Sequence, residues 1–199
     1  LVGSEMCIRD SSGWMHIEKN LDNKELISAL SKGGWDFVVI QEQSTAPAGP
    51  TESVVRNVYP YAARLDSLAH AGSPDVKVIY YMTWGHKDGY AHPTYPLCHT
   101  YEGMQDRLIT SYLEMAHANK GLCAPVGIAW KRVRLERPYN TLYWPDRSHP
   151  SKLGTYLAAN VIYATMLGRP YQSTFTADLD PELAEYIQQV AQQTVSKSI

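Results

Sequence analysis

The stretch W-D-F-V-V-I-Q-E-Q-S, residues 35–44, joins an apolar run to a polar turn. The run is continuous, contains β-branched residues and follows Gly33-Gly34, which is the pattern of a strand buried on both faces of a parallel sheet. Ligands of open parallel sheets bind outside the carboxyl ends of the strands. We therefore expect residues 41–44 to border a functional site.

Two other apolar runs, residues 77–82 and 122–126, predict further strands. Apolar residues at helical spacing predict helices between and after the strands. These helices are expected at residues 23–31, 51–71 with a kink at Pro60, 101–120, 127–137, from Pro150 to 167, and 181–195. The alternation of strand and helix predicts the α/β class, with helices on both faces of a parallel sheet in a three-layer α/β/α sandwich.

Composition limits the classes of partner. The 199 residues suffice for one domain, and a formal charge of −2 with 19% charged residues gives no electrostatic case for nucleic acid. No apolar run is long enough to cross a bilayer, so no membrane partner is expected. The oligomeric state is not predicted.

The sequence gives no reason to expect a metal or another cofactor. The spacings of His86, His92 and His99 match no helical or hairpin ligand pattern, and no C-x-x-C pair is present. Cys98 and Cys123 could form a disulfide or be two unrelated buried thiols.

A carboxylate and an imidazole stand three residues apart in W-P-D-R-S-H-P-S, residues 144–151, just before a helix. Asp146 can hold the His149 ring in one tautomer and stabilise its protonated form, as required of a histidine that takes a proton from a hydroxyl nucleophile. The alternative is that Asp146 caps the helix and His149 is a surface residue.

Together these blocks resemble the SGNH hydrolases, also called the GDSL esterase superfamily. The motif D-x-x-H-P-S followed by G-x-Y-L-A-A resembles the last block of the superfamily, and W-D-F-V-V-I-Q-E-Q-S and A-P-V-G-I-A-W resemble a branch catalogued as a domain of unknown function. The resemblance spans about residues 11–171. It implies a flavodoxin-like, five-stranded sheet and a Ser-His-Asp triad in which His149 is the general base and Asp146 orients it.

The resemblance also implies donors for an oxyanion. Gly13, in S-S-G-W, matches the glycine of the second block. The third block usually supplies an Asn, and since no Asn stands here, Gln41 or Gln43 must replace it. The alternative is that these glutamines only cap the strand and turn.

The loop after the second predicted strand is a candidate for substrate binding. Trp84 and His86 follow that strand and could line a pocket, although a surface loop with a packed Trp is the alternative. Residues 90–100 have no regular period, and a loop of this length is often a lid or a wall of a substrate site.

The first ten residues, L-V-G-S-E-M-C-I-R-D, resemble a translated sequencing adaptor from a metagenomic assembly. We expect residues 1–10 to be a non-native or disordered leader and residues 11–199 to be an SGNH-like domain that lacks its first strand. Only eight residues separate Ser4 from Gly13, whereas a crossover between parallel strands needs about a dozen, so Ser4 is not expected to be the nucleophile. A nucleophilic serine and a signal peptide are expected upstream, with a periplasmic or secreted location.

The expected activity is hydrolysis of O-acyl esters, with acetylated carbohydrate as the substrate class that the superfamily suggests. This chain alone is expected to be nearly inactive because its triad lacks the serine. The alternative is a non-catalytic carbohydrate-binding module on the same fold. A phosphate binder is disfavoured because no G-x-x-x-x-G-K-[ST] loop is present.

Overall fold

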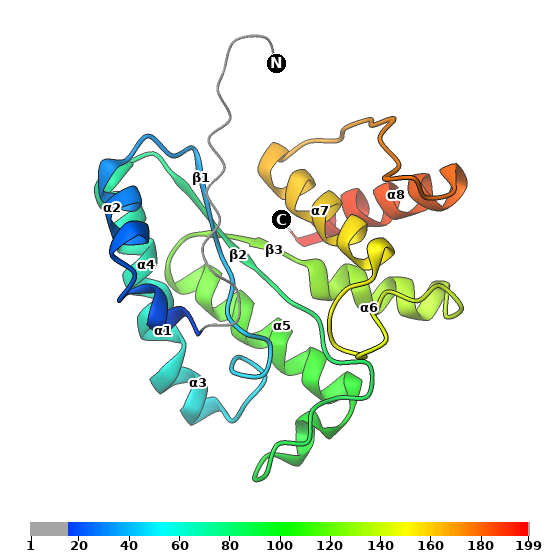
Figure 1. Cartoon of the computed structure of the whole chain (residues 1–199), viewed down its shortest axis with the longest axis horizontal. Helices are drawn as coiled ribbons and strands as arrows, with labels where there is room; N and C mark the ends of the chain where they lie inside the picture. The colour runs from blue at the N-terminus through cyan, green and yellow to red at the C-terminus, as the bar shows by residue number, and fades with distance from the viewer. Residues whose placement is uncertain (1–15, 199) are drawn as a thin grey trace.

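A three-stranded parallel sheet forms the centre of the molecule (Figure 1). The computed structural model describes residues 16–198. The strands are β1 (Phe37–Ile40), β2 (Lys77–Tyr81) and β3 (Leu122–Ala124), in the order β1-β2-β3. Val38 lies opposite Val78, and Ile79 lies opposite Leu122. The predicted α/β class and parallel sheet are confirmed.

Helices cover both faces of the sheet (Figure 1). They are α1 (Ile17–Asn20), α2 (Lys24–Lys32), α3 (Thr51–Asn57), α4 (Tyr59–Gly72), α5 (Tyr101–Ala118), α6 (Val126–Glu136), α7 (Lys152–Leu167) and α8 (Pro181–Ser198), with a 3-10 helix η1 (Pro96–His99). Val78 and Tyr80 of β2 pack in a core cluster with α4 and α5, whereas Ile79 packs in a second cluster with α6, α7 and α8. This alternation along β2 produces the predicted three layers.

The helix predicted over residues 51–71 is divided into α3 and α4 at Val58. Pro60 lies in the first turn of α4, where its missing N–H costs least. The expected kink is therefore a break between two helices.

The helix that follows the D-x-x-H motif begins later than predicted. Its N-cap is Ser151, whose hydroxyl accepts a hydrogen bond from the Gly154 N–H at 3.2 Å. Pro150 lies before this cap and forms a bridge with Tyr143, so its predicted place in the first helical turn is wrong. The serine hydroxyl satisfies an otherwise unpaired helix N–H, which a proline cannot do.

The cysteines and the possible membrane span were left open or excluded by the sequence. Cys98 and Cys123 are free thiols, so the alternative in which they form a disulfide is wrong. No helix in the described part of the chain is both long and apolar enough to cross a bilayer. The predictions for Ser4, Gly13 and residues 1–10 concern residues outside the described part.

Candidate active site

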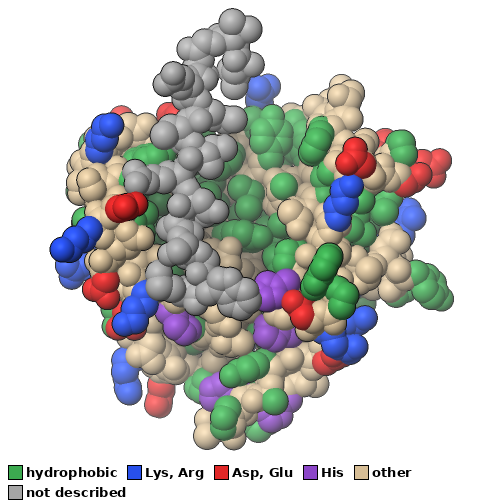
Figure 2. All heavy atoms as spheres, in the orientation of Figure 1, with side chains coloured by type: hydrophobic (Ala, Val, Ile, Leu, Met, Phe, Trp, Pro, Cys, Tyr) green, Lys and Arg blue, Asp and Glu red, His purple; other side chains and the backbone are tan. Residues whose placement is uncertain are grey.

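Two loops that follow strands and one loop that joins α6 to α7 meet at one edge of the sheet. They are residues 41–49 after β1, residues 82–95 after β2, and residues 142–151 before α7. Hydrogen bonds link the second loop to each of the others: Nε2 of His86 lies 3.2 Å from Oγ of Ser44, and the indole N–H of Trp84 donates to the carbonyl of Ser148. Figure 2 shows histidine side chains gathered over the lower half of this face, among hydrophobic ones.

Asp146 and His149 form the pair that the sequence predicts. The Nδ1 atom of His149 lies 2.7 Å from Oδ2 of Asp146. The other carboxylate oxygen, Oδ1, accepts hydrogen bonds from the backbone N–H groups of Ser148 and His149, each at 2.9 Å. The N–H of Ser148 and then the His149 ring lower the pKa of Asp146, so this carboxyl is ionised at neutral pH. Because Ser151 caps α7, the alternative that Asp146 caps this helix is wrong.

The loop after β2 holds this pair in place through backbone contacts. The indole N–H of Trp84 donates to the carbonyl of Ser148 at 2.9 Å, and the N–H of Lys87 donates to the carbonyl of Arg147 at 2.8 Å. The Arg147 guanidinium also forms an ion pair with Asp88. Arg147 has φ of 67°, a conformation rare for a residue with a side chain, and these contacts fix it.

Trp84 is itself held by the core. Its ring stacks on the fully buried Trp130, with centroids 4.0 Å apart and planes 4° apart. Beside it, the Tyr143 hydroxyl donates to the carbonyl of Gly85 at 2.7 Å. Trp84 therefore positions the loop that carries His149, a role that sequence reasoning missed because the contact joins residues 64 positions apart.

His86 lies beside the acid–imidazole pair. Its Nε2 atom is 3.2 Å from Oγ of Ser44, and its backbone N–H contacts Sδ of Met104 at 3.2 Å. Burial, and next the charge of His149, lower the pKa of His86, while Asp146 opposes this change. The structure thus brings Ser44 and a second, neutral imidazole to the candidate site.

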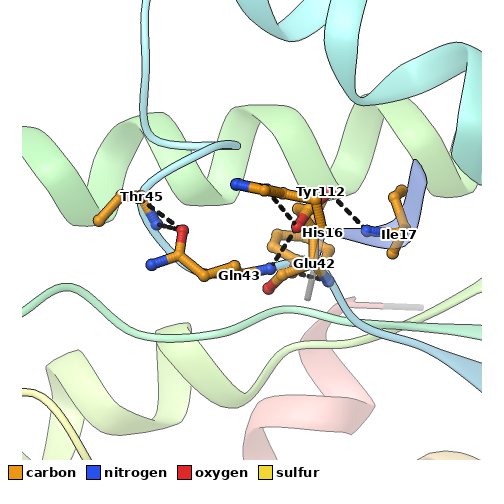
Figure 3. A network of polar contacts seen from close by, with 6 residues as sticks. All are labelled: His16, Ile17, Glu42, Gln43, Thr45 and Tyr112. Atoms are coloured by element: carbon orange, nitrogen blue, oxygen red, sulfur yellow. Dashed lines mark hydrogen bonds and ion pairs between the residues drawn. The ribbon is translucent and has the colours of Figure 1, made fainter. Parts of the chain in front are cut away.

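Glu42 is the buried centre of the polar turn after β1 (Figure 3). It is 1% exposed, and its carboxylate accepts hydrogen bonds from the N–H of Gln43 at 2.6 Å and of Ile17 at 3.1 Å. Nδ1 of His16 lies 3.0 Å from the same carboxylate. Burial raises the pKa of Glu42, against the effect of these partners. Glu42 fixes the backbone on which Gln43 and Ser44 are placed.

The two glutamines differ in their surroundings. The side-chain carbonyl of Gln43 accepts a hydrogen bond from the N–H of Thr45 at 2.9 Å. Figure 3 shows its amide nitrogen turned away from Thr45. Gln41 is exposed. Assignment of either glutamine to an oxyanion site remains a prediction, as does that of Gly13.

The described residues offer no obvious metal centre. Between residues 16 and 198, no group of three or more His, Cys, Asp or Glu side chains is arranged to hold an ion.

Comparison with known proteins places the fold. No protein-family model and no curated protein matches the chain. A protein from Slackia heliotrinireducens described as "a putative SGNH hydrolase" superposes with a TM-score of 0.62 and 29% identity, over 77% of this chain and 80% of that protein. A DUF4886 family protein from Bacteroides uniformis superposes with a TM-score of 0.70 and 16% identity, over 87% of this chain and 67% of that protein. At 16% identity the second likeness concerns the fold alone.

Proposed function

We propose that this chain is an SGNH hydrolase and that its site performs acid–base catalysis in the hydrolysis of an ester by a serine. The observation that carries the proposal is the 2.7 Å contact between Nδ1 of His149 and Oδ2 of Asp146, beside the loops at the carboxyl ends of parallel strands, where ligands of such sheets usually bind. A ring held at Nδ1 by a carboxylate takes up a proton at Nε2.

The proposed reaction has two stages. A serine hydroxyl attacks the ester carbonyl, and His149 takes the hydroxyl proton and then gives it to the leaving alcohol. Water next attacks the acyl-serine, and His149 transfers the water proton to the serine oxygen. Asp146 stabilises the imidazolium in both stages. We infer that the serine belongs to the first block of the superfamily, upstream of the motifs recognised here.

Stabilisation of the oxyanion is assigned to the turn after β1 and to Gly13. An amide donor acts best when it is fixed before the charge develops. The buried Glu42 carboxylate fixes the backbone of this turn through Gln43, which supports Gln43 as the donor. The substrate class, an O-acyl ester of a carbohydrate, rests on the superfamily. No cofactor is needed for this chemistry.

Hydrolysis of p-nitrophenyl acetate tests the proposal. The protein assayed is the chain preceded by whatever coding sequence lies upstream in its gene. We expect His149→Ala to lower kcat/KM by about 10²–10⁴-fold, the usual contribution of a general base. Asp146→Asn should also lower kcat/KM, because Nδ1 of His149 loses its anionic partner.

A matched histidine–aspartate pair provides the control. Nδ1 of His70 lies 3.0 Å from Oδ1 of Asp66 in α4, which ends before the amino end of β2, at the opposite edge of the sheet. His70→Ala should leave kcat/KM unchanged. Full activity in His149→Ala would refute the proposal.

For the chain alone we expect a rate of ester hydrolysis close to background. An ordinary esterase rate that His149→Ala abolishes would place the nucleophile within these 199 residues.

A further inference from the structure

Trp144 lies directly across a short turn from His149. The N–H of Trp144 donates to the carbonyl of His149 at 2.8 Å, and the neighbouring residues Tyr143 and Pro150 form an antiparallel bridge. Pro145 follows Trp144, and a residue before proline is restricted to the extended conformation that such pairing requires. In this register Trp144 and His149 are opposite partners of an antiparallel pair.

The turn presents both of these side chains on its outer face. Successive residues of an extended segment point to opposite faces. Tyr143 faces the core, where its ring lies edge-on to the fully buried Trp130, with centroids 5.2 Å apart. Trp144 and His149 face the other way: Trp144 is 61% exposed and the His149 side chain is 54% exposed. Opposite residues on one face have Cβ atoms about 4.5–5.5 Å apart, so the indole and the imidazole are neighbours.

The backbone that carries the indole is fixed without a ligand. The carbonyl of Trp144 accepts a hydrogen bond from the N–H of Arg147 at 3.0 Å. On the inner face, the hydroxyl of Tyr143 donates to the carbonyl of Gly85 at 2.7 Å. Single exposed apolar side chains are common on protein surfaces, so the exposure of Trp144 by itself indicates no function. Its position opposite the proposed general base does.

The proposed reaction determines which part of an ester lies nearest to Trp144. His149 gives its proton to the oxygen of the leaving alcohol, so this oxygen must come within hydrogen-bond reach of Nε2, about 3 Å. The first carbon of the alcohol is bonded to that oxygen, whereas the acyl group lies beyond the carbonyl carbon. A side chain beside the His149 ring therefore meets the alcohol before it meets the acyl group.

We propose that Trp144 selects the alcohol part of the ester, by packing its indole against a flat apolar group such as an aryl ring next to the ester oxygen. This inference rests on the proposed function for the reaction, and on the geometry of the turn for the contact. Aromatic rings gain from packing on one another in offset or edge-to-face arrangements. Arg147, on the same turn, is already paired with Asp88, which leaves the indole to recognise the alcohol.

Hydrolysis of benzyl acetate and methyl acetate tests the inference, with the chain and its upstream coding sequence as in the assay above. The two leaving alcohols differ little in acidity, so the esters have similar intrinsic reactivity. Trp144→Ala should lower kcat/KM for benzyl acetate by about tenfold or more, as expected for loss of an aromatic anchor, and by less than about twofold for methyl acetate. Trp144→Phe should retain most of the activity on benzyl acetate.

The acyl group provides an internal control. Benzyl acetate and benzyl butyrate share their alcohol, so Trp144→Ala should lower kcat/KM for both by the same factor. The matched variant is Tyr139→Ala, which removes a 99% exposed ring that follows α6 and should leave kcat/KM unchanged for all three esters. Equal losses for benzyl acetate and methyl acetate in Trp144→Ala would overturn the inference, and so would a loss that depends on the acyl chain.

NMR of the unmutated chain covers the case in which Trp144→Ala does not fold. Benzyl alcohol should shift the indole N–H signal of Trp144 together with the ring signals of His149, and methanol should shift neither. The indole N–H of Trp35, which donates to the carbonyl of Ala29 before the amino end of β1, should keep its signal in both titrations. An unshifted Trp144 signal in benzyl alcohol would overturn the inference.

Failure of the proposed function is distinguishable from failure of this inference. Ester hydrolysis that requires His149 but shows no preference for benzyl over methyl acetate traceable to Trp144 overturns the inference alone. If the upstream-extended protein hydrolyses none of the esters, the proposed function fails, and selection of an alcohol by Trp144 fails with it.

Discussion

The two carboxylate oxygens of Asp146 have different hydrogen-bond partners. Oδ1 accepts two backbone N–H groups and shapes the loop, whereas Oδ2 holds the His149 ring. The spacing D-x-x-H predicted the second task, because both residues lie in one short turn. The contact of His86 with Ser44 was not predictable in the same way, since it joins residues 42 positions apart.

The charge of His149 acts on its neighbour. Because the pKa of His86 is lowered by burial and by His149, His149→Ala should raise the pKa of His86 toward its ordinary value of 6.5. A pH titration of the His86 ring signals by NMR measures this change. An unchanged or lower pKa of His86 in the variant would show that the two rings do not interact. His99→Ala, which removes an exposed histidine of η1, serves as the control.

At the scale of elements, the start of α7 and the segment before it are packed with no spare room. A Cβ on Gly154 would lie 2.2 Å from the carbonyl oxygen of Leu142 and 2.5 Å from the ring of Trp130. The sequence G-x-Y-L-A-A marked this glycine only through a family resemblance. The structure supplies the physical reason, which is the close approach of α7 to Trp130 of α6 and to Leu142 in the loop that follows α6.

Gly154→Ala should therefore destabilise the protein. Overpacking of this kind usually costs about 1–3 kcal/mol, against a smaller gain in helix propensity. Urea denaturation should show a lower free energy of unfolding for Gly154→Ala. Thr155→Ala, at the neighbouring exposed position, should stay within about 0.5 kcal/mol of the unmutated chain. Equal stability of the two variants would show that Leu142 and Trp130 move aside at little cost.

Across the whole molecule, hydrophobic periodicity predicted the order and type of the helices and strands better than the residues at which they begin and end. The three strands and the long helices lie where the apolar patterns place them, because burial on both faces of the sheet requires those patterns. The predicted strand ends were too long by one or two residues, and η1 was not expected. These details depend on long-range contacts, such as the buried Cys98 beneath the loop, that a local pattern does not contain.

The free energy of unfolding of the protein should depend on pH through Glu42. Burial raises the pKa of Glu42 above its ordinary value of 4.5, so the folded state binds this proton more tightly than the unfolded state. The contribution of Glu42 to stability is therefore greatest at or below about pH 4.5 and falls as pH rises through the folded pKa. In Glu42→Gln this dependence is lost.

Chemical denaturation from pH 4 to pH 8 measures the effect. The unmutated chain should exceed Glu42→Gln in free energy of unfolding, because the amide NH₂ cannot accept the N–H groups of both Ile17 and Gln43, and the difference should narrow with rising pH. If the difference in free energy of unfolding instead grows with pH, the hydrogen bonds to Glu42 lower its pKa by more than burial raises it. Glu52→Gln, at an exposed position in α3, should show neither effect.

One short segment, residues 84–88, contacts Ser44 in the turn after β1 and holds the loop with Arg147 and Ser148. Anyone grafting a new specificity loop into this scaffold can exchange residues 90–95 but must leave residues 84–88 intact. Because this segment holds the loop before α7, a change that displaces residues 84–88 should also disturb the Asp146–His149 pair. Specificity and turnover are thus expected to vary together when this segment is redesigned.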